Sequence, residues 1–211
     1  MAEKNAREIK QRIFNTAVKL FARKSYGLVG VREIAADAGV SISMISYHFG
    51  GKAGILEAII EKYFGLFTTM FNAAVRDDHS FEQNVRRFFH GFVDLIRSER
   101  DLSLVWHSEL NNEIPEVSDI KYRHLLEMGA DANRLLGKIG LDITRDVETV
   151  NIIGSAMIQM IYSHFTSGRL LDQQNETIEF DDEFYDRYAA ILADLCLNGI
   201  KGVFTVNETA T

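Results

Sequence analysis

The sequence predicts an all-α protein in which a small N-terminal domain is fused to a larger helical domain. Apolar residues recur at three- and four-residue spacing along most of the chain, which is the pattern of amphipathic helices. A single proline in 211 residues and an apolar content of 46% suit a mostly helical globular protein. Charge is uneven: residues 1–63 carry ten basic and six acidic side chains, whereas residues 64–211 carry thirteen and twenty-four. Only the N-terminal part is therefore suited to an anionic partner.

The first helix is predicted at residues 7–24. Its apolar stripe covers the helices that follow, and residues 2–4 before it are expected to form a frayed basic arm. The stripe consists of Ile9, Ile13, Ala17, Leu20 and Phe21.

Two short helices are then predicted, at 31–38 and 42–49, with a tight turn between them. Gly39 is placed to end the first helix in the left-handed conformation, and Ser41 is placed to cap the second. Two short helices joined by a three- to four-residue turn containing glycine form the helix-turn-helix layout. In that layout the second helix enters the major groove of DNA.

Several side chains around the second helix are candidates for DNA contact. If Ile45 and Phe49 point inward, the remaining positions face outward, where hydroxyls and Met44 can meet base edges and Lys52 can meet a phosphate. An isolated tyrosine or histidine on a short helix can equally be a packing or capping residue. The candidate DNA-binding residues are Arg32, Ser41, Ser43, Met44, Ser46, Tyr47, His48 and Lys52.

Residues 9–56 resemble the DNA-binding domain of the TetR family of bacterial transcriptional repressors. The resemblance is carried by LFARKSYG (20–27), REIAADAGVS (32–41) and YHFGGK (47–52), followed by Ile55 and Leu56. The Tyr-His-Phe sequence is similar to one branch of that family. Gly30 stands where the family usually has Thr or Ser, and Ser46 stands where it usually has an aromatic residue. The usual aromatic phosphate contact is therefore assigned to Tyr47 and His48.

A longer helix is predicted from Lys52 to about residue 75, and it links the small domain to the rest of the chain. The predicted domains are residues 1–52, the helix-turn-helix DNA-binding domain, and 53–211, a helical regulatory and dimerisation domain. After a polar break at 76–80, further helices are predicted at 81–98, 102–111 and 115–139.

The last two predicted helices, at about 147–168 and 182–204, carry more apolar surface than one flank can bury. In the first of them apolar residues occupy nearly the whole circumference. Two such helices from each of two subunits would form a four-helix interface with two-fold symmetry, and the family resemblance implies the same homodimer. The alternative is that both helices belong only to the core of a monomer.

The C-terminal domain is also expected to contain a pocket for a small-molecule effector of unknown identity. Aromatic and methionine side chains with occasional polar partners are typical of ligand sites, although the same stripe at helical spacing can be plain core. The candidate ligand-binding residues are Phe88, Phe92, Trp106, His107, Met128, Met157, Met160 and His164.

The sequence offers no constellation for catalysis, a metal or a cofactor. It has no His-Glu-x-x-His, no Gly-x-Ser-x-Gly and no phosphate-binding loop, and its single cysteine, Cys196, is interpreted as a small buried hydrophobe. His107, Glu109 and Glu113 lie close in sequence. They form either a metal or ligand contact or a set of solvated or hydrogen-bonded helix residues. With neither a signal peptide nor a membrane span predicted, the chain is expected in the cytoplasm.

These observations together predict a ligand-responsive, sequence-specific transcriptional regulator and not an enzyme. It is expected to act as a homodimeric repressor on a pseudo-palindromic double-stranded DNA operator. The alternative is a protein-interaction module derived from a helix-turn-helix, without specific DNA binding.

Overall fold

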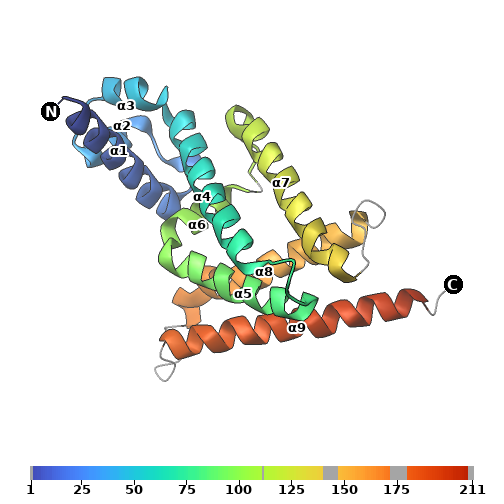
Figure 1. The fold of residues 1–211 in the computed structure, drawn as a ribbon. Helices are drawn as coiled ribbons and strands as arrows, with labels where there is room; N and C mark the ends of the chain where they lie inside the picture. Colours follow the sequence, from blue (N-terminus) through green and yellow to red (C-terminus); the bar gives the residue numbers. More distant parts are fainter. Residues whose placement is uncertain (1, 111, 140–146, 172–179, 209–211) are drawn as a thin grey trace. The chain divides into compact units, whose positions relative to one another are not determined.

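The computed structural model describes residues 2–110, 112–139, 147–171 and 180–208, and within these ranges helices are joined by short connections (Figure 1). No described residue lies in a strand, so the all-α prediction is confirmed. The α-helices are α1 (Ala2–Lys24), α2 (Val31–Ala38), α3 (Ile42–Phe49), α4 (Lys52–Ala74), α5 (Phe81–Ser98), α6 (Arg100–Glu109), α7 (Ser118–Leu136), α8 (Val147–Leu171) and α9 (Asp182–Glu208). Single 3₁₀ turns form η1 (Tyr26–Leu28), η2 (Pro115–Val117) and η3 (Gly137–Ile139).

The chain folds into two compact units. Unit 1 comprises Met1–Phe67 and Ser98–Glu127, and unit 2 comprises Thr68–Arg97 and Met128–Thr211. Helix α4 contributes residues to both units, as expected for a linking helix. Unit 1 also includes α6 and the first half of α7, which the sequence-based division at residue 52 assigns to the other domain.

Unit 1 has a continuous apolar core. Helix α1 packs against α2, α3 and α6, and it buries Ile13, Ala17 and Phe21. The single tryptophan, Trp106 on α6, stacks on Tyr63 of α4 with ring centroids 5.6 Å apart. Packing of this kind adds about 0.5–1.5 kcal/mol per aromatic pair beyond the burial of area, so α6 is firmly attached to the first half of α4.

Unit 2 is organised around α5, α8 and α9. Phe92 of α5 meets Tyr162 of α8 edge-to-face, with ring centroids 6.0 Å apart. Cys196 of α9 is buried, and burial raises the pKa of its thiol to about 11. The thiol is therefore neutral at physiological pH, and the prediction that Cys196 packs as a small hydrophobe is confirmed.

Several sequence-based element boundaries were wrong, among them the helix predicted at 115–139, which is α7 (Ser118–Leu136) with a 3₁₀ turn at each end. Helix α1 begins at Ala2, so the expected N-terminal arm is instead the first turn of that helix. The helix predicted at 102–111 begins at Arg100 and ends at Glu109, while Asn111 lies outside the described residues. No helix in the described ranges is both long and apolar enough to span a membrane.

Candidate nucleic-acid interface

The two short helices of the N-terminal region are joined by a turn that depends on Gly39. Its backbone is left-handed, with φ 63° and ψ 41°, and this conformation costs glycine little. The amide of Val40 donates to the carbonyl of Ala35 at 2.9 Å, which closes the end of α2. The predicted bounds of both helices, 31–38 and 42–49, match the structure.

Ser41 precedes α3 as predicted, but its side chain does not cap the helix. Its hydroxyl instead makes a hydrogen bond with the hydroxyl of Ser43, with 2.7 Å between the two oxygens. Both serines are exposed. The pair therefore holds two polar groups together at the start of the exposed face of α3, which is the candidate face for reading DNA and is called the reading face below.

Helix α3 has one buried side and one exposed side. Ile45 is fully buried, which fixes the rotation of the helix on the domain. Ser43, Ser46 and Tyr47 are exposed, with Tyr47 at 78% exposure, while Met44 and His48 are half-buried. The side of α3 opposite Ile45 therefore presents hydroxyls and one phenol to solvent.

Three glycines with different roles lie where α3 gives way to α4, two in the turn and Gly54 in the first turn of α4. Gly50 and Gly51 have φ of 73° and 131°, values that L side chains rarely adopt. Gly54 has an ordinary backbone, but a Cβ built on it would lie 1.7 Å from the carbonyl oxygen of Phe49. This close approach of α4 to the last residue of α3 fixes the angle between the two helices, and with it the orientation of the reading face.

Lys52 was predicted to offer its charge to a phosphate, and the structure gives its ammonium group other partners. Nζ donates to the carbonyl oxygens of Tyr26 at 3.1 Å and Val29 at 3.0 Å, and it lies 4.1 Å from the centroid of the Tyr26 ring. These carbonyls belong to the connection between α1 and α2, so Lys52 ties that connection to the start of α4. Arg32, at the start of α2, is exposed.

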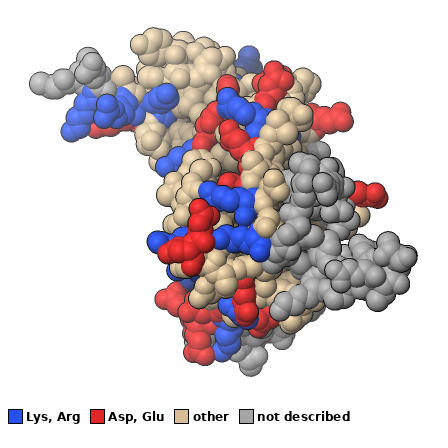
Figure 2. Space-filling view, turned by 45° about the vertical axis from the view of Figure 1, so that its right-hand side comes forward, with Lys and Arg blue, Asp and Glu red and all other residues tan. Residues whose placement is uncertain are grey.

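Two basic residues of α1 that were not among the predicted DNA-binding residues reach the helix-turn-helix. Lys10 places Nζ 5.4 Å from the ring centroid of Phe49, and Arg12 donates to the carbonyl of Gly39 at 3.3 Å. Basic side chains gather beside the N-terminal end of the chain at the upper left of Figure 2. The basic residue type at these positions could have suggested them as candidates. Their contacts could not be predicted, because the partners lie 27 and 39 residues away in sequence.

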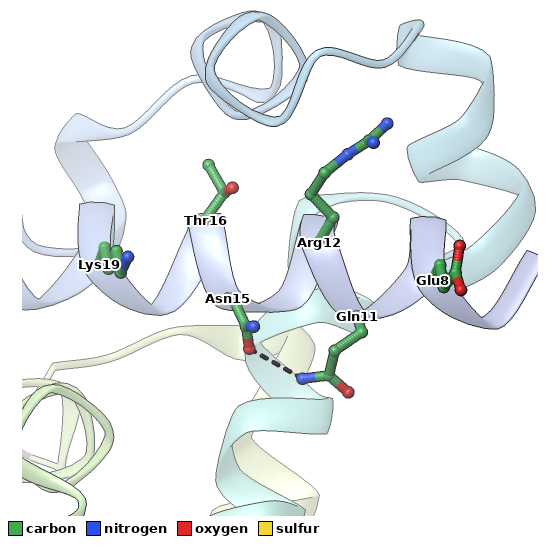
Figure 3. Close-up of a pocket in the computed structure, with 6 residues that line it drawn as sticks. All are labelled: Glu8, Gln11, Arg12, Asn15, Thr16 and Lys19. Carbon is green, nitrogen blue, oxygen red and sulfur yellow. Dashed lines mark hydrogen bonds between the residues drawn. The ribbon is translucent and has the colours of Figure 1, made fainter. Parts of the chain in front are cut away.

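One side of α1 carries a shallow hollow of about 410 Å³. Its lining is a stripe of polar side chains, among which Gln11 donates to Asn15 at 2.8 Å (Figure 3). The hollow lies outside the candidate DNA-binding and ligand-binding residues. It is lined by Glu8, Gln11, Arg12, Asn15, Thr16 and Lys19.

Ser25 stores backbone strain at the end of α1. Its φ of 64° and ψ of 156° fall in a region occupied almost only by glycine. We expect Ser25→Gly to raise the free energy of unfolding by about 1 kcal/mol, because relief of strain outweighs the added freedom of the unfolded chain. Urea unfolding followed by circular dichroism measures the change, and a loss of stability would contradict the expectation.

The candidate ligand-binding residues fall in both units. Trp106 and His107 belong to unit 1, where Trp106 is packed in the aromatic core. The others belong to unit 2, where they lie on three helices. Phe88 and Phe92 lie on α5 with ring centroids 5.6 Å apart, while Met157, Met160 and His164 lie on α8. Met128 begins the second segment of unit 2.

The α8 group faces α9. The sulfur of Met157 lies 3.7 Å from the Cys196 sulfur, and the carbonyl of Met160 accepts a hydrogen bond from the Tyr188 hydroxyl at 2.7 Å. His164 sits among five aromatic rings with centroids 4.8–5.6 Å away. Among the described residues no group of three His, Cys, Asp or Glu side chains could hold a metal ion.

Comparison with known proteins identifies the N-terminal region. Residues 13–59 match the family model described as bacterial regulatory proteins, tetR family. The chain is 27% identical over 210 residues to the uncharacterised HTH-type transcriptional regulator YerO of Bacillus subtilis (strain 168), an alignment that covers 93% of this chain and 71% of that protein.

Solved structures share the whole fold. A TetR-family transcriptional regulator from Bordetella parapertussis 12822 aligns with a TM-score of 0.72 at 16% identity, covering 90% of this chain and 94% of that one. The regulator FadR from Bacillus subtilis, solved in complex with stearoyl-CoA, aligns with a TM-score of 0.61 at 18% identity and covers 90% and 98% of the two chains. The helix-turn-helix geometry agrees with the family match: residues 13–59 form a DNA-binding domain of the type found in the tetR family of bacterial regulatory proteins, and the chain shares its fold with TetR-family regulators.

Proposed function

We propose that this regulator acts in the cytoplasm as a homodimeric repressor that places two copies of α3 in successive major grooves of a pseudo-palindromic operator. The observation that carries the proposal is the division of α3 into a buried side, held by Ile45, and an exposed polar side at Ser43, Ser46 and Tyr47. A two-fold dimer reads half-sites about one helical turn apart or slightly more.

The candidate DNA-binding residues of α3 divide into base readers and phosphate contacts. Ser43 and Met44 lie in the first turn of α3, whose N-terminal residues meet base edges when such a helix enters the groove. Tyr47 and His48 lie in the last turn, and we assign them to the phosphate backbone. Arg32, Ser41 and Ser46 extend the surface, while Lys52 supports it by holding the connection before α2.

Three substitutions separate these roles. We expect Tyr47→Phe to weaken binding to all sequences alike by about fivefold, the loss of one hydrogen bond of about 1 kcal/mol. Ser43→Ala and Met44→Ala should instead change base preference at defined operator positions. Fluorescence anisotropy on an operator and its single-base variants measures both effects.

The matched control is Tyr122→Phe, because Tyr122 is also exposed but lies on α7. It should bind the operator as the unchanged protein does. A changed base preference in Tyr47→Phe, or an unchanged one in Ser43→Ala and Met44→Ala, would reverse the assignment.

The dimer interface is assigned to α8 and α9. Large apolar side chains stay exposed on both helices in the single chain, namely Ile152 of α8 and Ile191 and Leu195 of α9. Ile191 and Leu195 are four residues apart and therefore share one face of α9. A second copy of the same two helices would cover these side chains in a four-helix interface.

An effector is proposed to act through α4. The last carbonyls of α4 accept hydrogen bonds from Arg87 at Ala73 and Ala74, and Val75 just beyond accepts one from Arg134. Cations at a helix C-terminus are stabilising, so this end is firmly held in unit 2. A ligand that repacks unit 2 would therefore move α4 as a rigid element.

The effector site itself is assigned to Phe88, Phe92, Met128, Met157, Met160 and His164 in unit 2, with Trp106 and His107 of unit 1 as further candidates. The stearoyl-CoA in the FadR structure supports a ligand-responsive role for this fold. Coupling of about 1–3 kcal/mol between effector and operator would change DNA affinity by roughly fivefold to over a hundredfold.

A further inference from the structure

Helix α6 carries a buried carboxylate, that of Glu109, which is not part of the proposed DNA-binding surface. Glu109 is 2% exposed. Its Oε1 accepts the backbone N–H of Tyr26 at 2.8 Å, and its Oε2 accepts the side-chain amide of Asn112 at 2.8 Å. A carboxylate taken out of water is costly unless it is hydrogen-bonded, so these two bonds fix its position. Of the two interpretations of Glu109 from sequence, the hydrogen-bonded one is confirmed.

The segment that Glu109 holds is the strained one. Ser25 occupies a backbone region close to exclusive to glycine, and such strain persists only where the surroundings hold the chain in place. The amide of Ser25 donates to Phe21 at 3.1 Å, and the next amide, that of Tyr26, donates to Glu109. Without the carboxylate, the amide of Tyr26 loses its acceptor and the strained segment is free to relax.

From Tyr26 the contacts continue to the reading helices. The Tyr26 carbonyl accepts from Lys52, and the same ammonium group donates to Val29. Val29 directly precedes Gly30, the N-cap residue of α2. The start of α2 is therefore tied to α6 through one carboxylate and one ammonium group.

The α6 end of this connection is itself held in place. Lys121 of α7 is buried, and its ammonium group donates to the carbonyls of Glu109 at 2.7 Å and Asn112 at 2.6 Å. Burial lowers the pKa of Lys121. The carboxylate thus projects from a helix end that is closed by its own cationic partner.

We propose that Glu109 is a positioning residue for DNA binding: it holds the Ser25–Tyr26 segment, and through Lys52 the start of α2, in the arrangement in which α3 meets the major groove. This inference rests on the proposed function. It gives α6 a direct part in setting operator affinity, and it makes the Glu109 to Tyr26 hydrogen bond the place where a change in α6 would reach the DNA-binding surface.

The test compares four variants of the full chain on the operator fragment. Glu109→Ala removes the acceptor, Glu109→Asp keeps the charge but shortens the side chain by one methylene, and Glu109→Gln keeps an acceptor oxygen at the same length. Glu113→Ala is the control, because Glu113 is an exposed carboxylate four residues further along the chain and its loss changes the net charge equally. Operator affinity is measured well below the unfolding midpoint, together with hydrogen exchange at the amide of Tyr26.

The expected result is a dissociation constant at least about tenfold higher for Glu109→Ala and Glu109→Asp, since a hydrogen bond to a charged group is worth about one decade or more. Exchange at Tyr26 should accelerate similarly, and Glu109→Gln should restore most of the affinity. General electrostatics predicts the opposite sign, because removing an acidic group favours DNA, and Glu113→Ala should bind equally or slightly more tightly.

Three outcomes are decisive. Unchanged affinity in folded Glu109→Ala and Glu109→Asp overturns the positioning role, as does a lowered unfolding midpoint without any change in affinity. If Glu109→Ala does not fold, the operator affinities of Glu109→Asp and Glu109→Gln are compared instead. An unchanged protein that binds no fragment overturns the proposed function, and the positioning role with it.

Discussion

Gly54→Ala is expected to lower the free energy of unfolding by more than about 4 kcal/mol and to abolish operator binding. The added Cβ would lie 1.7 Å from the carbonyl oxygen of Phe49, a backbone atom that no side-chain rotation can move away. Either the end of α3 or the start of α4 must shift. Both movements change the angle of the reading face, so DNA binding is lost even in molecules that remain folded.

The matched control for this substitution lies on the same helix. Gly65 is exposed on α4, and a Cβ built there meets no atom within 4 Å. Gly65→Ala should leave operator binding unchanged and raise stability by up to about 1 kcal/mol, because alanine is the better helix former. Urea unfolding and fluorescence anisotropy on both variants measure these effects, and normal stability in Gly54→Ala would contradict the close approach of Gly54 to Phe49.

The second large effect is expected at the α9 surface. The double substitution Ile191→Asp with Leu195→Asp places two carboxylates where two exposed apolar side chains stand. Two-fold symmetry repeats each change, so four apolar side chains leave the interface. At about 1.5 kcal/mol or more for each, the dimer dissociation constant should rise at least about 10⁴-fold. Sedimentation equilibrium and operator titration measure the loss of dimer and of tight DNA binding.

Leu126→Asp is the control for the dimer variant. Leu126 is 58% exposed, like Ile191, but it lies on α7 and outside the proposed interface. It should leave both the oligomeric state and operator affinity unchanged. A double variant that still sediments as a dimer would show that α9 does not form the interface.

Local signals explain why the reading helices could be predicted from sequence. Gly39 and Gly50 both have positive φ, and each ends a helix at the residue where the pattern of apolar side chains also stops. The helix boundaries there depend on neighbouring residues, so a sequence contains the information directly. The start of α1 had no such signal, and it was placed too late.

Long-range partners explain what the sequence could not reveal. Lys52 has the residue type and position of a phosphate contact, yet its ammonium group lies on carbonyls 23 and 26 residues away. Glu109 accepts a hydrogen bond from an amide 83 residues away. The positive φ of Ser25 could not be predicted either, because serine rarely adopts that conformation. The candidate ligand-binding residues are likewise mostly aromatic residues and methionines, yet they fall in two units. The division into units is known only from the tertiary structure.

Selection of bound fragments from random duplex DNA, by the purified full chain at two salt concentrations, tests the central claim most directly. A dimeric, sequence-specific regulator should enrich an inverted repeat with half-sites about one helical turn apart, and its binding should fall steeply as salt is raised. Absence of both enrichment and salt dependence would contradict sequence-specific DNA binding, and it would favour a helix-turn-helix turned to protein partners.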